Sequence, residues 1–132
     1  MNTDLTMLAA STLLTAILVS GKGFAMWIYW PVGEVLGNRQ SPPALPAWAE
    51  RADRAHHNML ENFTHFAALV LIVNVAGLAN YQTAIGATVF FWARLAHAII
   101  YISGFWQVRW IAFFTGVGGE ILIALRLVSA LL

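Results

Sequence analysis

Four long apolar stretches, separated by polar or proline-rich breaks, dominate the hydropathy pattern of this chain. A helix needs about 20 residues to cross a hydrocarbon core roughly 30 Å thick. Windows of that length lie at residues 4–30, 48–78, 83–102 and 108–131, which predicts four spanning helices. The second window is too long to lie wholly in hydrocarbon, so we expect its first turns to project beyond the bilayer.

The breaks predict how these helices connect. Residues 31–48 hold all four prolines, which predicts an extended loop, and Gly21-Lys22-Gly23 predicts a flexible interruption of the first helix. Turns are predicted at residues 80–82 and 103–104, and helices joined by such short turns are antiparallel neighbours. The expected fold is an all-α membrane protein, a four-transmembrane-helix bundle that forms a single domain over residues 1–132.

The composition agrees with a membrane protein and excludes several other classes. Of 132 residues, 60% are hydrophobic and 10% are charged, and the mean hydropathy is +0.71; soluble domains carry about 25% charged residues. A net charge of +1 without a basic cluster argues against nucleic-acid binding. The chain has no cysteine, so any thiol chemistry must arrive with a ligand.

Basic residues predict the orientation in the membrane. One side of the predicted bundle carries Arg39, Arg51, Arg54 and Arg109, in or beside two of the connections, whereas the other side has only Arg126. Cytoplasmic loops are enriched in arginine and lysine. We therefore expect these two connections in the cytoplasm and both termini outside.

Polar side chains form a stripe on each of three predicted helices. The second helix carries Arg51, Arg54, Asn58, Glu61 and His65, which fall within roughly 80° of one another at about 100° per residue. An ionised side chain near the bilayer centre costs at least about 2.5 kcal/mol, so this stripe must face protein, water or a ligand. Similar stripes are Arg94, His97 and Tyr101 on the third helix and Arg109, Gly116 and Glu120 on the fourth. Together they predict a site between helices or between subunits.

Ion pairs offer a purely structural alternative for the same charges. The pairs in question are Arg51 or Arg54 with Glu61 or Asp53, and Arg94 with Glu61 or Glu120. Such pairs would fix helix packing without binding a ligand. A metal site is not expected, because the adjacent His56 and His57 point about 100° apart and His97 has no ligand partner four residues away. His57 is instead expected to point at solvent.

Two motifs resemble a known family. They are Glu50-Arg51-x-x-Arg54-Ala-His56-x-Asn58-x-x-Glu61 and, after an apolar helix, Ala93-Arg94-x-x-His97-x-x-x-Tyr101. Together they resemble the MAPEG family, the membrane-associated proteins in eicosanoid and glutathione metabolism. The resemblance implies a homotrimer in which glutathione, the co-substrate, binds between subunits near the cytoplasmic membrane surface. It also implies a bacterial member located in the inner membrane.

The resemblance implies a role for each motif residue. Arg109 would be the catalytic residue that stabilises the glutathione thiolate, and the residues that bind the tripeptide would be Arg51, Arg54, His56, Asn58, Glu61, His97 and Tyr101. Relatives often use a basic residue from the first helix, for which this chain offers only Lys22 or Arg39. Trp110 and Phe113 stand where several relatives have hydroxyl-bearing residues, so hydroxyl assistance to the thiol is not expected.

The implied function is a membrane-bound glutathione S-transferase that conjugates lipophilic electrophiles, with glutathione-dependent reduction of lipid hydroperoxides as a second activity. Guanidinium groups suit the two carboxylates of glutathione, and Glu61 suits its ammonium. One alternative is a non-catalytic lipid-binding or scaffold protein on the same fold. Another is a small transporter or proton relay through Glu61, His97 and Glu120, which would need a continuous polar path across the membrane.

Overall fold

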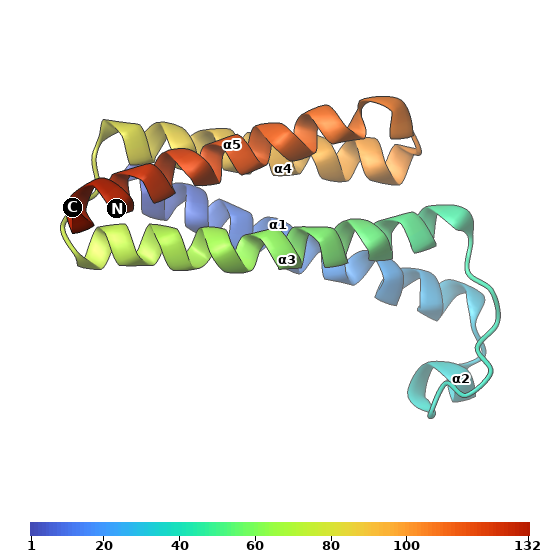
Figure 1. Cartoon of the computed structure of the whole chain (residues 1–132). Helices are drawn as coiled ribbons and strands as arrows, with labels where there is room; N and C mark the ends of the chain where they lie inside the picture. The colour runs from blue at the N-terminus through green and yellow to red at the C-terminus, as the bar shows by residue number, and fades with distance from the viewer.

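The computed structural model describes all 132 residues and consists of helices and connections without a strand (Figure 1). The helices are α1 (Thr3–Tyr29), α2 (Val32–Leu36), α3 (Ala47–Val75), α4 (Tyr81–Ser103) and α5 (Trp106–Leu131). Four of them, all except α2, are long and apolar enough to cross a membrane. The prediction of an all-α bundle with four spanning-length helices is thus confirmed.

The four long helices run side by side as two pairs (Figure 1). The principal contacts join α4 to α5 and α1 to α3, and α3 and α4 connect the two pairs. Both termini lie at one end of the bundle, whereas α2 and its flanking loops extend from the other end. This second end, where α3 and α5 begin, is also where the polar side chains of the sequence stripes gather.

Two details of the predicted organisation are wrong. The helix α1 continues through Gly21-Lys22-Gly23 without a break, because Gly21 packs closely on Ala52 of α3 and Lys22 Nζ forms an ion pair with Asp53 Oδ2 at 2.8 Å. The proline-rich segment is not extended throughout, since α2 forms within it directly after Pro31, whose fixed backbone angle suits a helix start.

Another difference concerns the start of α4. The predicted turn at residues 80–82 is instead the helix cap and first turn, because the Asn80 side chain accepts a hydrogen bond from the Thr83 backbone N–H and the Thr83 hydroxyl accepts one from the Asn80 N–H. This reciprocal arrangement satisfies backbone donors that a helix end otherwise leaves free.

Close packing occurs both between the two helix pairs and within one of them. Phe66 of α3 and Phe90 of α4 are buried and stacked, with ring centroids 3.8 Å apart. Between α4 and α5, Gly86 and Gly119 bring the backbones so close that a methyl group added to either would lie 2.6 Å from the carbonyl oxygen of the other. Small residues allow this kind of approach in membranes.

Several hydrogen bonds join different parts of the chain at the end of the bundle with the termini. The buried Asp4 carboxylate accepts a hydrogen bond from the Thr83 hydroxyl at 2.7 Å, which joins α1 to α4. Gln82 of α4 donates to the Leu122 carbonyl of α5, and Arg126 of α5 donates to the Leu78 carbonyl after α3.

Candidate functional site

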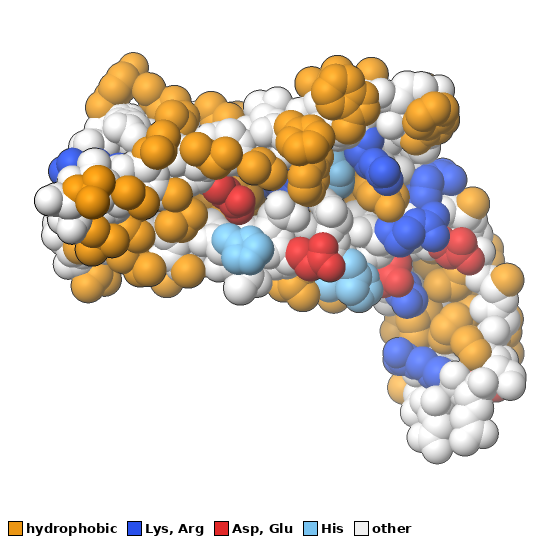
Figure 2. Space-filling model, viewed as in Figure 1, with side chains coloured by type: hydrophobic (Ala, Val, Ile, Leu, Met, Phe, Trp, Pro, Cys, Tyr) orange, Lys and Arg blue, Asp and Glu red, His pale blue; other side chains and the backbone are white.

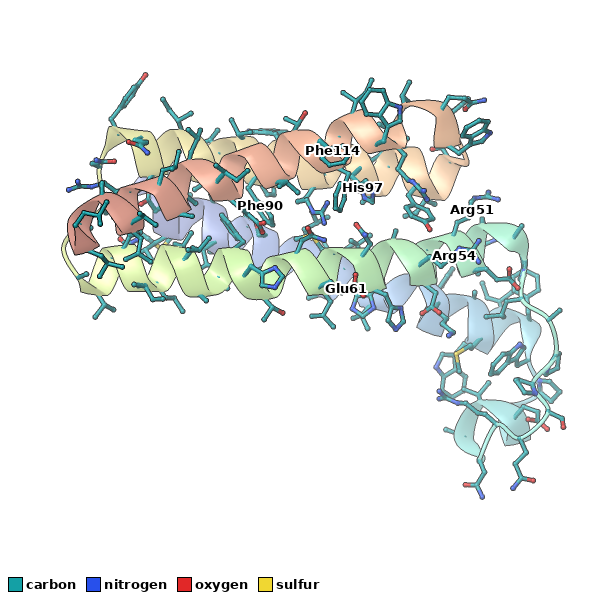
Figure 3. The ribbon with its side chains drawn as sticks, viewed as in Figure 1. Arg51, Arg54, Glu61, Phe90, His97 and Phe114 are labelled. Atoms are coloured by element: carbon teal, nitrogen blue, oxygen red, sulfur yellow. The ribbon has the colours of Figure 1, made fainter.

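A cavity of about 480 Å³ lies between α3, α4 and α5 near the end of the bundle from which α2 extends. Its lining residues are Arg54, His57, Asn58, Glu61, His97, Tyr101, Arg109, Trp110 and Phe113. Figure 3 shows Arg54 and Glu61 along α3 and His97 on the neighbouring helix pair. Figure 2 shows the Lys and Arg side chains of this face gathered mostly at the same end, while apolar side chains cover much of the rest.

The cavity brings together six of the eight site residues that the sequence suggested: Arg54, Asn58, Glu61, His97, Tyr101 and Arg109. Residues 54, 58 and 61 share one face of α3 because side chains three or four positions apart are neighbours on a helix. The same spacing joins His97 and Tyr101 on α4, whose rings are 5.6 Å apart.

The other two suggested residues lie beside the cavity rather than in its wall. Arg51 donates from Nε to the Ile102 carbonyl at 2.8 Å and lines a smaller adjoining cavity of about 200 Å³, which also contacts Arg54 and Arg109. His56 faces a separate cavity among α1, α2 and α3, together with Lys22 and Arg39. Two positions after Arg54, a helical side chain has turned by about 200°, which places His56 on the far side of α3.

His57, expected to point only at solvent, is exposed but also lines the site cavity. Its ring Nδ1 lies 2.9 Å from the Asp53 carbonyl oxygen and 3.6 Å from the carboxylate. The signal was present in the sequence, because His57 is three positions after Arg54 and four before Glu61 and therefore lies on their side of the helix.

Two charged side chains of the cavity, Glu61 and Arg109, have no internal ion-pair partner. The ion pairs of the chain are Lys22 with Asp53, Arg54 with Glu50 at 3.9 Å, and the His57 contact with Asp53. Neither Glu61 nor Arg109 forms one, and the Arg109 guanidinium lies 4.4 Å from the centre of the Tyr101 ring. The alternative in which Glu61 pairs with Arg51 or Arg54 is therefore wrong, and Glu61 and Arg109 can both meet a ligand.

Arg94 also differs from its expected structural role. It is not within ion-pair distance of Glu61 or Glu120; its Nη2 instead donates to the backbone oxygen of Asn58 at 3.1 Å and to the side-chain Oδ1 of Asn58 at 3.2 Å. The side chain is buried between the rings of Phe90 and Phe113. Arg94 thus touches a cavity residue without lining the cavity itself.

The cavity has two chemically different halves. Its α3 side presents ionisable and amide groups, whereas its α4 and α5 side presents the rings of His97, Tyr101, Trp110 and Phe113 together with the guanidinium of Arg109. Trp110 is 60% exposed and Phe114, in contact with Phe113, is 63% exposed on the outer surface of α5 (Figure 3). The aromatic half therefore continues onto the apolar outer surface of the bundle.

No group of three or more His, Asp or Glu side chains converges in a way that could hold a metal ion. The arrangement instead suits an organic ligand with anionic and cationic groups at one end of the cavity and an apolar molecule at the other. Arginine recognises carboxylates through paired N–H donors. Aromatic rings contribute large apolar contact surfaces.

Comparison with known proteins identifies two relatives and a family for this chain. Over 82 residues the chain is 36% identical to "Microsomal glutathione S-transferase 1" of Rattus norvegicus and 34% identical to the protein of the same name in Mus musculus. Each match covers 61% of this chain and 53% of the relative, so the chain matches about half the length of these relatives. No solved structure matches the chain. The model of the MAPEG family matches residues 5–129, and the chain, an integral membrane protein, belongs to this family.

Proposed function

We propose that this protein is a membrane-bound glutathione S-transferase. The observation that carries the proposal is one cavity lined by Glu61 of α3 and by Arg109 of α5, both without an internal ion pair, and by the aromatic rings of α4 and α5. Glutathione, the co-substrate, occupies the polar part, and a lipophilic electrophile occupies the aromatic part. Family membership and the similarity to two microsomal glutathione transferases support this assignment.

Charge complementarity supports glutathione as the ligand. Glutathione carries two carboxylates and one ammonium group, and the cavity offers guanidinium groups from Arg54 and Arg109 and a carboxylate from Glu61. Asn58, His97 and Tyr101 add uncharged hydrogen-bonding groups. Further basic residues lie outside this cavity. The adjoining cavity contains Arg51, and the cavity on the far side of α3 contains Lys22, Arg39 and His56, so a ligand that extends out of the main cavity could also contact these residues.

The reaction follows from the position of Arg109. A free thiol has a pKa of about 8.5, and an adjacent guanidinium lowers this pKa and raises the thiolate fraction at neutral pH. The thiol proton passes to solvent, the thiolate sulfur attacks the electrophilic carbon, and a C–S bond forms as a halide leaves with its electron pair. In the reduction of a lipid hydroperoxide, the same thiolate would attack the terminal peroxide oxygen, the O–O bond would break, and the alkoxide would take a proton from solvent and leave as the alcohol. A second glutathione would then displace water from the resulting sulfenic acid and form the disulfide.

Assembly into a homotrimer completes the site in this proposal. Glu61 and His65 are exposed on α3 within the length of chain that spans the membrane. Exposure of such groups to lipid is costly, whereas contact with a second copy of the chain removes that cost. We assign the end with α2 and the cavity to the cytoplasmic side of a bacterial inner membrane and the termini to the opposite side, because Arg39, Arg51, Arg54 and Arg109 lie at the cavity end.

The decisive experiment compares Arg109→Ala with Arg126→Ala in detergent-solubilised protein. Arg126 is the matched control, because it also lies on α5 but bonds the Leu78 carbonyl at the other end of the bundle. Titration of glutathione into the wild-type protein should produce ultraviolet thiolate absorbance, and an aryl halide should be conjugated. Arg109→Ala should lose the absorbance and reduce kcat by about a hundredfold, as removal of a charge-stabilising donor does elsewhere.

Two results would contradict the proposal. Unchanged conjugation by Arg109→Ala would show that this guanidinium does not activate the thiol. Absence of both glutathione binding and thiolate absorbance in the wild-type protein would favour the non-catalytic lipid-binding or scaffold role. Circular dichroism of both variants shows whether the helices remain folded.

A further inference from the structure

Arg94 is the most deeply buried charged group beside the site cavity, at 2% exposed, and it has no acidic partner within ion-pair distance. Two of its nitrogens, Nε and Nη1, have no hydrogen-bond partner, and the third, Nη2, contacts only Asn58. An arginine buried in a membrane-spanning helix is costly. Its one specific contact is with a residue that lines the cavity.

The chemistry of this contact fixes the orientation of the Asn58 amide. A guanidinium can only donate hydrogen bonds, so the Asn58 atom that faces Arg94 must be the oxygen Oδ1. The amide nitrogen Nδ2 then lies on the other branch of the side chain and makes no hydrogen bond within the protein. Asn58 consequently offers two N–H donors, rather than an acceptor, to a molecule in the cavity.

We propose that Arg94 is a positioning residue, which acts through Asn58 and holds its amide with the donor side toward an anionic or carbonyl oxygen of the bound thiol tripeptide. The inference rests on the proposed function, because glutathione is the ligand that it orients. Without Arg94, the amide would rotate freely or present Oδ1 to the ligand. An acceptor facing a carboxylate oxygen repels it, and ordering a free side chain on binding also costs affinity.

Arg94 is itself held by the packing of α5. Gly116 leaves room for the arginine side chain, and a methyl group added there would lie 3.1 Å from Arg94 Cδ. The rings of Phe90 and Phe113 lie 5.8 and 5.4 Å from the guanidinium carbon, measured to their centroids. The Glu120 side chain, one turn after Gly116, has a buried oxygen without a hydrogen-bond partner. A change at Gly116 can therefore displace Arg94 without removing its charge.

The test is a double-mutant cycle that measures the Kd of glutathione by equilibrium dialysis with detergent-solubilised protein. Arg94→Met and Asn58→Ala should each weaken binding by about tenfold, the scale of one lost ordered contact, and the double variant should bind no more weakly than Asn58→Ala alone. In Arg94→Met, the KM for glutathione should rise while kcat changes little, because Arg109 is intact. Arg126→Met is the control for removing an arginine that bonds a carbonyl elsewhere.

A second pair of variants tests the same contact if Arg94→Met does not fold. Gly116→Ala should weaken glutathione binding by several-fold, whereas Gly118→Ala, where a methyl group would meet no atom within 4 Å, should not. Arg94→Lys keeps the charge but loses the planar donor fork, so its Kd should fall between those of the wild type and Arg94→Met.

The possible results separate the two proposals. Additive effects of Arg94→Met and Asn58→Ala would overturn the positioning role, as would wild-type affinity in Gly116→Ala and Arg94→Lys. If the wild-type protein binds no glutathione, the proposed function is wrong and the positioning role falls with it. If the wild-type protein binds glutathione and the effects of Arg94→Met and Asn58→Ala are not additive, the result supports both the proposed function and the positioning role of Arg94.

Discussion

The close approach of α4 and α5 makes a quantitative prediction about stability. A methyl group added at Gly119 would lie 2.6 Å from the Gly86 carbonyl oxygen and 2.8 Å from the Phe90 nitrogen, whereas an ordinary contact begins at 3.4 Å. The two backbones would therefore have to separate by the difference, about 0.8 Å. Both contacts are backbone atoms, so a rotation of a side chain cannot relieve them.

The net cost for Gly119→Ala follows from two opposing effects. Overpacking of a close-packed interior costs about 1–3 kcal/mol, and the better helix propensity of alanine returns up to about 1 kcal/mol. We expect a net loss of about 1–2 kcal/mol, which corresponds to a fall in Tm of roughly 4–8 °C for a chain of this size. Gly118→Ala gains the propensity without the contact and should melt at or above the wild type.

Thermal unfolding of the two variants in the same detergent, followed by tryptophan fluorescence or circular dichroism, measures this difference. The comparison is well matched because the two glycines are neighbours on α5 and receive the same methyl group. Equal Tm values for Gly119→Ala and Gly118→Ala would refute the reasoning. They would mean that α4 and α5 do not approach as closely as the structure describes.

Two further predictions concern the ends of the bundle. Thr83→Val should lower the free energy of unfolding by about 1–3 kcal/mol, because the buried Asp4 carboxylate loses its hydroxyl donor; thermal unfolding measures the loss, and Thr88→Val, which breaks only a bond to its own helix, should cost less. Trp110→Leu should reduce kcat/KM about three- to tenfold for an aromatic acceptor relative to an aliphatic one with the same reactive group. Trp92→Leu, exposed and outside the site cavity, is the control, and an equal ratio in both variants would contradict a role for the Trp110 ring.

The helices could be predicted because membrane spans require length and apolarity, which are local properties of a sequence. The continuity of α1 could not. Gly21-Lys22-Gly23 contains poor helix formers by themselves, and the segment is helical because Ala52 and Asp53 of α3 contact it. These partners come from a different part of the chain, so the local pattern does not contain them.

The site could be predicted in part for a similar reason. Helical spacing correctly grouped Arg54, Asn58 and Glu61, because neighbours on one helix follow from residue numbers alone. The partner of Arg94 could not be found this way. The sequence offered Glu61 and Glu120 as acidic partners for Arg94. Only the relative placement of the helices shows that the guanidinium contacts the two oxygens of Asn58 instead.

The placement of the hydrogen bonds along α5 has a consequence for the cavity. Its two polar links to other elements, at Leu122 and Arg126, both lie in its second half. The first half, which carries Arg109, Trp110 and Phe113, makes no hydrogen bond to another long helix and is tethered through Gly104, which adopts a left-handed backbone conformation. Side-chain packing alone joins this half to the other long helices, so we expect the cavity wall that it forms to adjust its position more readily than the hydrogen-bonded second half. For the proposed transferase, a broad range of acceptors would then result from the positions of the hydrogen bonds that hold α5 rather than from the shape of the aromatic wall.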